Sequence, residues 1–94
     1  MSKLTKKEFE ILRRLWESGR PYTVSEFYNS NSDLAKPTIA KAFKTLAANG
    51  FIKGGAFVQS KTNFAQSFVA NLTKEEFLQL RKNQLSASPN LLFN

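Results

Sequence analysis

The sequence predicts a mainly α-helical domain with one small β-hairpin, and three observations lead to this fold class. A helix-start pattern, in which an apolar residue is followed by Thr, two other residues, Glu and Phe, occurs at residues 4–9, 22–27 and 72–77. In each copy the Thr and Glu can form a capping box, and the two outer apolar residues a hydrophobic staple. A fourth helical stretch ends at Gly50, after which the apolar spacing changes from helical to strand-like. The resulting order is that of a winged helix-turn-helix, with a three-helix core, a wing and a fourth, C-terminal helix.

The first two helices are located by their capping boxes and their apolar spacing. The first is predicted over residues 6–17, and the second over residues 24–29, after a very short strand at residues 22–23. Both helices carry side chains for one core, namely Phe9, Leu12, Leu15 and Trp16 on the first and Val24, Phe27 and Tyr28 on the second.

The third helix is predicted to begin at Pro37 and to end before Gly50, which suits the left-handed position just past a helix. Its apolar residues have the spacing of a core-facing stripe, namely Ile39, Ala42, Phe43 and Leu46. The opposite face holds only cations and hydroxyls, namely Thr38, Lys41, Lys44 and Thr45. Such a face fits the major groove of DNA, and it fits an ordinary solvated surface equally well.

Two strands are predicted after this helix, at residues 51–59 and 63–70, with a turn at residues 60–62. The glycine pair at positions 54 and 55 predicts a bulge or a bend in the first strand. Lys61 is expected at the tip of this wing.

A fourth helix is predicted over residues 74–84, followed by a tail whose residues 91–93 are apolar. We expect residues 1–72 to form a winged-helix DNA-binding domain. Residues 73–94 are a possible dimerisation element, and the apolar tail could dock on the protein's own core or on a partner.

The charge distribution indicates a polyanionic partner. The chain has 14 Lys and Arg against 7 Asp and Glu, a net charge of +7. No acid occurs between Asp33 and Glu75, and the six lysines of that interval are Lys36, Lys41, Lys44, Lys53, Lys61 and Lys74. An acid-free cationic stretch of this length is typical of nucleic-acid binding, and the alternative is a merely basic surface.

The composition argues against an enzyme. The chain has no Cys and no His, which removes the thiol nucleophile, the commonest general base and the commonest zinc ligands. We therefore expect no metal, no cofactor and no catalytic residue. No apolar run approaches a membrane span and no signal-peptide pattern opens the chain, so we expect a cytoplasmic protein that does not contact the membrane.

Seven residues are predicted to bind duplex DNA, namely Lys36, Thr38, Lys41, Lys44, Thr45, Lys53 and Lys61. Thr38, Lys41 and Thr45 are candidates for base edges, and Lys36, Lys44 and Lys61, with Arg13 or Arg14, are candidates for phosphates. The alternative function is a winged-helix protein–protein interaction module that uses the same helix or the apolar tail.

Several segments also resemble a known family. They are the pattern Leu-Thr-x-x-Glu-x-x-Ile-Leu-x-x-Leu-Trp-Glu-x-Gly over residues 4–19, the Thr-Ile pair at residues 38–39 with its following Leu46 and Gly50, the Phe-Ile pair at 51–52 and Leu-Thr-x-Glu-Glu at 72–76. Together they are similar to the penicillinase-repressor family of bacterial winged-helix regulators, over about residues 4–82. The resemblance implies a homodimeric repressor on a palindromic operator, with Thr38 and Lys41 at base-contacting positions. The chain lacks the C-terminal cysteines of that family's copper-responsive branch.

Overall fold

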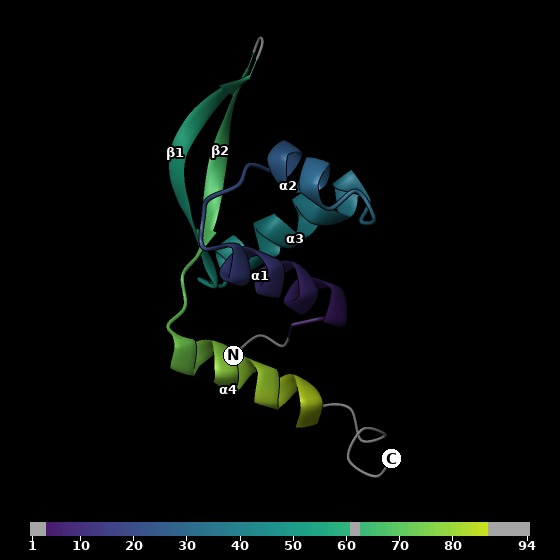
Figure 1. The fold of residues 1–94 in the computed structure, drawn as a ribbon, viewed down its shortest axis with the longest axis vertical. Helices are drawn as coiled ribbons and strands as arrows, with labels where there is room; N and C mark the ends of the chain where they lie inside the picture. Colours follow the sequence, from purple (N-terminus) through teal and green to yellow (C-terminus); the bar gives the residue numbers. More distant parts are fainter. Residues whose placement is uncertain (1–3, 61–62, 87–94) are drawn as a thin grey trace.

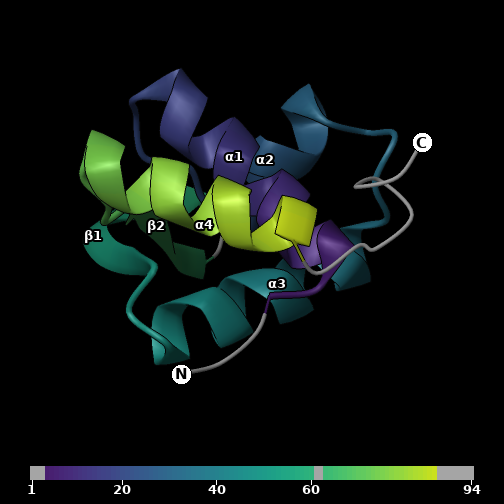
Figure 2. The same cartoon turned by 90° about the horizontal axis from the view of Figure 1, so that it is seen from below.

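The computed structural model describes residues 4–60 and 63–86, and it has the predicted order of elements. The helices and strands are α1 (Lys6–Ser18), α2 (Val24–Ser30), α3 (Lys36–Ala48), β1 (Ile52–Ser60), β2 (Asn63–Ala70) and α4 (Lys74–Ser86). The hairpin extends beyond the helices at one end of the molecule, and α4 lies at the other end (Figure 1). Seen from below, α4 runs across the end of the helical core (Figure 2). The winged helix-turn-helix prediction is confirmed, whereas Lys61 and residues 91–93 lie outside the described residues.

All three predicted capping boxes are present. In each, the Thr Oγ1 accepts from the Glu N–H at 3.1 Å, and the Glu carboxylate accepts from the Thr N–H at 2.8–3.0 Å. The pairs are Thr5–Glu8, Thr23–Glu26 and Thr73–Glu76. A capping box satisfies two backbone donors that the first helical turn leaves unpaired, so local sequence alone sets where these helices begin.

The start of α3 differs from the prediction by one residue. The helix begins at Lys36, so Pro37 occupies its second position, and the preceding Ala35 has an extended backbone and provides no side-chain cap. A residue before Pro is biased away from helical geometry, but here that bias does not prevail at Lys36. The predicted end is confirmed, because Gly50 has a φ of 79°.

One core joins α1, α2, α3 and the first residue of β1. The side chains that are essentially buried include Leu12 and Leu15 of α1, Phe27 of α2, Phe43 of α3 and Ile52 of β1. The four predicted core residues of α3 are all buried. The core is extended to the hairpin by Phe43, whose ring meets that of Phe68 in β2 edge-on at 5.7 Å.

The hairpin has the predicted antiparallel pairing and bulge. The register shifts between Gly54 and Phe57, so one residue of β1 is left over in the ladder. The short strand predicted at residues 22–23 appears as one bridge, in which Tyr22 exchanges two backbone hydrogen bonds with Phe68 at 2.8 and 2.9 Å. This bridge fixes the base of the wing to the segment between α1 and α2.

The α4 helix packs on α1 through one aromatic cluster. Phe77 is buried and stacks on Trp16, with ring centroids 4.3 Å apart, and on Phe9 at 5.7 Å. The Trp16 indole N–H also donates to the carbonyl of Leu72 at 3.3 Å. The C-terminal helix is therefore held against the domain by contacts that leave its other faces open.

Candidate nucleic-acid interface

The α3 helix turns one face inward and leaves the opposite face to solvent. Burial of its apolar stripe fixes its rotation about its own axis, so Lys41 and Lys44 are exposed while Thr38 and Thr45 are half-buried at one side. Ala40 is also exposed on this helix and was not among the predicted site residues. With Lys36 at its start, the helix therefore presents three ammonium groups, and two hydroxyls lie nearer the core.

The structure brings α1 residues beside the predicted base-reading positions. Thr38 and Lys41 line a shallow depression together with Thr5, Lys7 and Glu8 from the start of α1. The sequence segment that contains α3 has no acid, but in the folded protein Glu8 of α1 lies at the edge of the α3 surface. The Glu8 carboxylate already accepts a hydrogen bond from the Thr5 N–H in the capping box. Lys7 lines the same depression, and its position beside α3 could not be predicted from the distribution of charges along the sequence.

The two arginines predicted as possible phosphate contacts are paired with carboxylates. Arg13 forms ion pairs with Glu10 and Glu17, and Arg14 forms them with Glu10 at 2.8 Å and with Asp33 at 3.1 Å. Hydrogen bonds from Arg13 and then Arg14 hold the pKa of Glu10 below its ordinary value. The Arg14 hydrogen bond likewise lowers the pKa of Asp33. Because these guanidinium groups are engaged, the structure argues against their predicted role at phosphates.

The lysines of α3 and β1 have no such partners. Lys36, Lys41, Lys44 and Lys53 are all exposed, and none forms an ion pair within the part of the chain that the structure describes. The first turn of α3 also contains no acid, unlike those of α1, α2 and α4. The lysines of α3 and β1 therefore keep their positive charge, whereas carboxylates neutralise the charge of Arg13 and Arg14 on α1. Lys61, the seventh predicted residue, lies outside the described residues.

The wing carries two exposed aromatic side chains that the sequence reasoning did not single out as functional. Phe57 of β1 is 65% exposed and Phe64 of β2 is 68% exposed. The alternation of the strands gives their face, but it does not reveal that α2 lies beside the other face, where Val58 and Ala65 share a depression with residues of α2.

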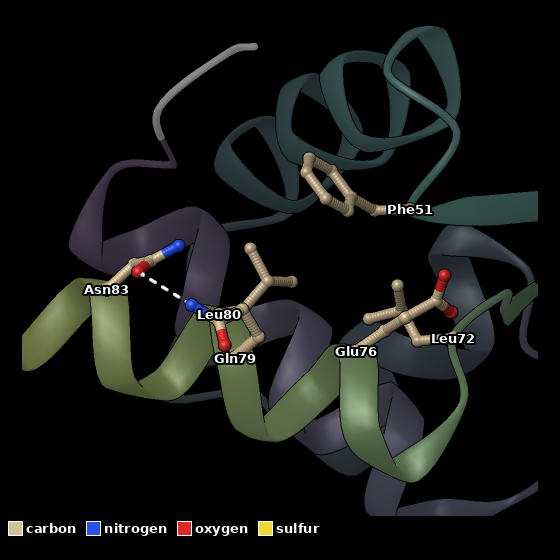
Figure 3. A pocket seen from close by; sticks show the side chains of 6 residues that line it. All are labelled: Phe51, Leu72, Glu76, Gln79, Leu80 and Asn83. Atoms are coloured by element: carbon tan, nitrogen blue, oxygen red, sulfur yellow. Dashed lines mark hydrogen bonds between the residues drawn. The ribbon is translucent and has the colours of Figure 1, made fainter.

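A second, apolar depression lies between α4 and the turn that follows α3. Its volume is about 220 Å³, and it is lined by Phe51, Leu72, Glu76, Gln79, Leu80 and Asn83. Phe51 and Leu80 point toward the same space, and Gln79 donates to Asn83 at 3.3 Å on the rim (Figure 3). Leu78 on the same helix is 48% exposed. The depression therefore offers apolar side chains, in contrast to the basic face of α3.

In the described part of the chain, residues 4–60 and 63–86, no three His, Cys, Asp or Glu side chains are grouped as a metal ion would require. None of its helices has the length and apolarity needed to cross a bilayer.

The comparisons with known proteins concern the fold. No protein-family model and no curated protein sequence matches this chain. The structure is similar to MarR of Staphylococcus aureus in complex with salicylate and kanamycin, with a TM-score of 0.59 and 20% identity over 95% of this chain and 64% of that protein. It is also similar to the adhesin competence repressor AdcR of Streptococcus pyogenes, with a TM-score of 0.54 and 18% identity over 95% of this chain and 60% of that one.

A third similar structure is the Hop2–Mnd1 complex of Giardia lamblia, with a TM-score of 0.51 and 22% identity over 93% of this chain and 56% of the matched one. At these identities the likeness establishes the winged helix-turn-helix fold alone. The chain spans 60–64% of the two bacterial proteins. No family match supports the penicillinase-repressor resemblance in particular, so that assignment stays a prediction.

Proposed function

We propose that this protein is a cytoplasmic transcriptional regulator, and specifically a repressor, that binds duplex DNA of defined sequence through α3 and the wing. The observation that carries the proposal is the combination of a buried inner face of α3 with exposed lysines on its outer face that form no ion pair with any described residue. A helix held rigidly in this way can enter the major groove without rearrangement of the core.

The predicted residues divide into two roles. Lys41, Thr38 and Thr45 face outward or sideways from α3 and are assigned to base edges, where Lys donates to guanine and the Thr methyl contacts thymine. Lys36, at the start of α3, and Lys44, further along it, are assigned to phosphates, which position the protein on the duplex without reading its sequence.

Lys53 on β1 and Lys61 at the predicted wing tip complete the phosphate contacts. Lys53 is exposed and belongs to a hairpin whose sequence, residues 52–70, has no acid. A cationic wing next to a cationic helix is expected to raise both the affinity for DNA and its dependence on salt.

The structural neighbours support this reading at the level of fold. The Streptococcus pyogenes neighbour is named a repressor, which is consistent with the repressor function proposed here. The small molecules named with MarR belong to that protein, and the proposal includes none of them.

We further propose that the protein acts as a homodimer through residues 73–94, with residues 1–72 as the DNA-binding domain. A single recognition helix contacts one half-site, and two-fold dimers place two such helices about one helical turn of DNA apart. The apolar depression beside Leu80 and the half-exposed Leu78 make α4 the best candidate surface. Leu78→Asp should shift the protein toward monomer in sedimentation, while the exposed Glu75→Gln should not. Equal sedimentation of all three proteins would remove α4 from this role.

DNA binding is tested by selection of bound sequences from random duplex DNA, followed by titration at several salt concentrations. The logarithm of the affinity should fall with the logarithm of salt, with a slope of about −0.9 per phosphate neutralised. Lys44→Gln should reduce the magnitude of that slope by about 0.9, the share of one phosphate contact. Lys74→Gln is the matched control. Lys74 is exposed on α4, which lies at the end of the molecule opposite the wing.

Base reading is tested separately with Thr38→Ala, which removes the γ-methyl and the hydroxyl, and with Lys41→Gln. Each should relax the sequence preference at one position of the selected site while retaining binding to random duplex. Failure of the parent protein to bind any duplex at low salt would refute the regulator proposal.

The second candidate, an interaction module without specific DNA binding, is favoured by one observation. Large apolar side chains are exposed at both ends of the molecule, namely Phe57 and Phe64 on the wing and Leu78 on α4. The neighbour from Giardia lamblia is itself named as a complex of two proteins. Weak duplex binding with no sequence preference would favour this function over the first.

A further inference from the structure

The wing exposes a pair of phenylalanines that its own fold does not cover. Phe57 is 65% exposed and Phe64 is 68% exposed, and neither makes a ring contact within the described part of the chain. A single exposed apolar residue is ordinary, but two large aromatics side by side on a projecting hairpin indicate a contact surface.

The strand register places the two rings on one face of the hairpin. Phe57 is opposite Gln66, and Gln59 is opposite Phe64, so the two aromatics are diagonal neighbours. Diagonal positions lie about 7–8 Å apart, which is within reach for aromatic side chains. Farther down the same face, Phe68 packs on Phe43 of the core, whereas Val58 and Ala65 on the other face share a depression with residues of α2.

The side chains between the rings are amides. Gln59 is exposed, and Gln66 lies across the glycines of β1, where its Nε2 donates to the Gly55 carbonyl at 3.5 Å. A Cβ at Gly54 would come within 2.3 Å of the Gln66 Nε2, so the glycine makes room for this amide. The result is a surface of two aromatic rings with hydrogen-bonding groups beside them.

The charge of the hairpin indicates what kind of partner this aromatic surface binds. The hairpin sequence, residues 52–70, contains no acid, and Lys53 is exposed and forms no ion pair with any described residue. Glu26 of α2 shares a depression with Gln59, and its carboxylate already accepts a hydrogen bond from the Thr23 N–H. Proteins that bind the DNA minor groove combine Gln, Asn or cations, which read its edges, with apolar wedges such as Phe that insert between base steps and kink the duplex. An amide-flanked aromatic pair on a basic hairpin has this composition.

We propose that Phe57 and Phe64 form a wedge that inserts between base pairs in the minor groove and kinks the DNA on which α3 is docked. This inference rests on the proposed function, because it assumes that α3 holds the duplex. The contact of Phe43 in α3 with Phe68 in β2 supports it, since it fixes the wing relative to the recognition helix. The deformed base steps then contribute to specificity through the cost of unstacking them.

The experiment measures bending of a defined duplex. The probe is a duplex of about 30 base pairs, recovered by selection with the parent protein and labelled at its ends with a donor and an acceptor dye. Binding of the parent should raise energy transfer, because a kink of roughly 20–90° shortens the end-to-end distance. The double variant Phe57→Ala/Phe64→Ala should lose most of this change and bind about tenfold more weakly, because it loses the stacking of the rings on bases and the contacts that the bend permits, which in the parent outweigh the cost of unstacking. Each single variant should show an intermediate effect.

Val58→Ala is the matched control. Val58 is also on β1 and is 37% exposed, but it is opposite Ala65 on the other face of the hairpin. It should bend the probe as the parent does. A second probe carries one mismatched base pair at the kinked step, where unstacking costs less. The parent should prefer it to the intact duplex, and the double variant should not.

The outcomes separate the wedge from the proposed function. If the parent binds no duplex, the regulator proposal fails and the wedge fails with it. If the parent binds but does not bend the probe, or the folded double variant bends it equally, the wedge is wrong and the regulator proposal stands. If the double variant sediments as a smaller species and still bends the probe, the face is a protein interface and the wedge is overturned. Circular dichroism of each variant shows whether it is folded.

Discussion

Replacement of Phe77 by Ala tests how firmly α4 is held on the domain. Phe77 is only 5% exposed, and its ring stacks on Trp16 at 4.3 Å and on Phe9 at 5.7 Å. Truncation of a buried Phe to Ala typically costs about 3–5 kcal/mol. Trp16 and Phe9 are half-buried, so water can reach part of the space that the ring leaves. We therefore expect a loss near the low end, about 3 kcal/mol of docking free energy.

This loss should appear as release of α4 rather than as unfolding of the core. The core residues of α1, α2 and α3 do not depend on Phe77, whereas α4 has few other buried side chains. Trp16 is the only tryptophan, so its fluorescence reports directly on the departure of α4. We expect a red-shifted emission in Phe77→Ala before any denaturant is added, with the urea transition of the helical core retained.

Glu75→Gln is the matched control for this experiment. Glu75 lies two residues before Phe77 on α4 and is exposed, so its substitution should change stability by less than about 0.5 kcal/mol. If the emission and the urea transition of Phe77→Ala coincide with those of the parent, or if the two variants lose the same free energy, α4 is not held by the aromatic cluster.

Three further predictions concern the local devices that set the fold, and urea titration measures each. Thr23→Ala should cost about 1–2 kcal/mol, because Thr23 is buried and its hydroxyl caps α2; an unchanged midpoint would mean that this cap is dispensable. Gly50→Ala should cost about 1–2 kcal/mol, since Gly50 has a φ of 79°, and Gly50→Asn should cost less. Hydrogen bonding to Arg13 lowers the pKa of Glu10 in the folded protein. The ionised Glu10 carboxylate therefore contributes its full stabilisation above its ordinary pKa of 4.5, and this stabilisation is lost as the pH falls through the lower pKa of the folded state. Glu10→Gln should therefore flatten the acid limb of the stability profile, and an identical profile for both proteins would contradict the ion pairs.

Much of the fold could be predicted because its signals are local. A capping box needs only a Thr and a Glu three residues apart, and Gly50 needs only a left-handed backbone, so neither depends on distant parts of the chain. The one-residue error at the start of α3 has the same origin. The local preference of the residue before Pro is weak, and at Lys36 the helical geometry prevails over it.

The candidate site was less predictable because it depends on contacts between distant residues. Arg14 was predicted as a possible phosphate contact, but it reaches Asp33, nineteen positions along the chain. Glu8 was recognised as a capping residue, but its place beside Thr38 follows from the packing of α1 on α3. The exposure of Phe64 depends on which face of the hairpin α2 covers, and the alternation of residues does not encode that.

The carboxylates stabilise the fold at positions away from the proposed DNA-binding lysines, so folding and DNA binding depend largely on different side chains. Six of the seven carboxylates form capping boxes or pair with arginines, namely Glu8, Glu26 and Glu76 in the caps and Glu10, Glu17 and Asp33 in the ion pairs. None of the acids lies on α3 or the hairpin, so the lysines there keep their full field. Loss of such a lysine should change DNA affinity without changing stability, because exposed unpaired charges contribute little to folding. Glu8 is the exception, since it caps α1 and also borders Thr38, and a substitution there is expected to alter both stability and binding.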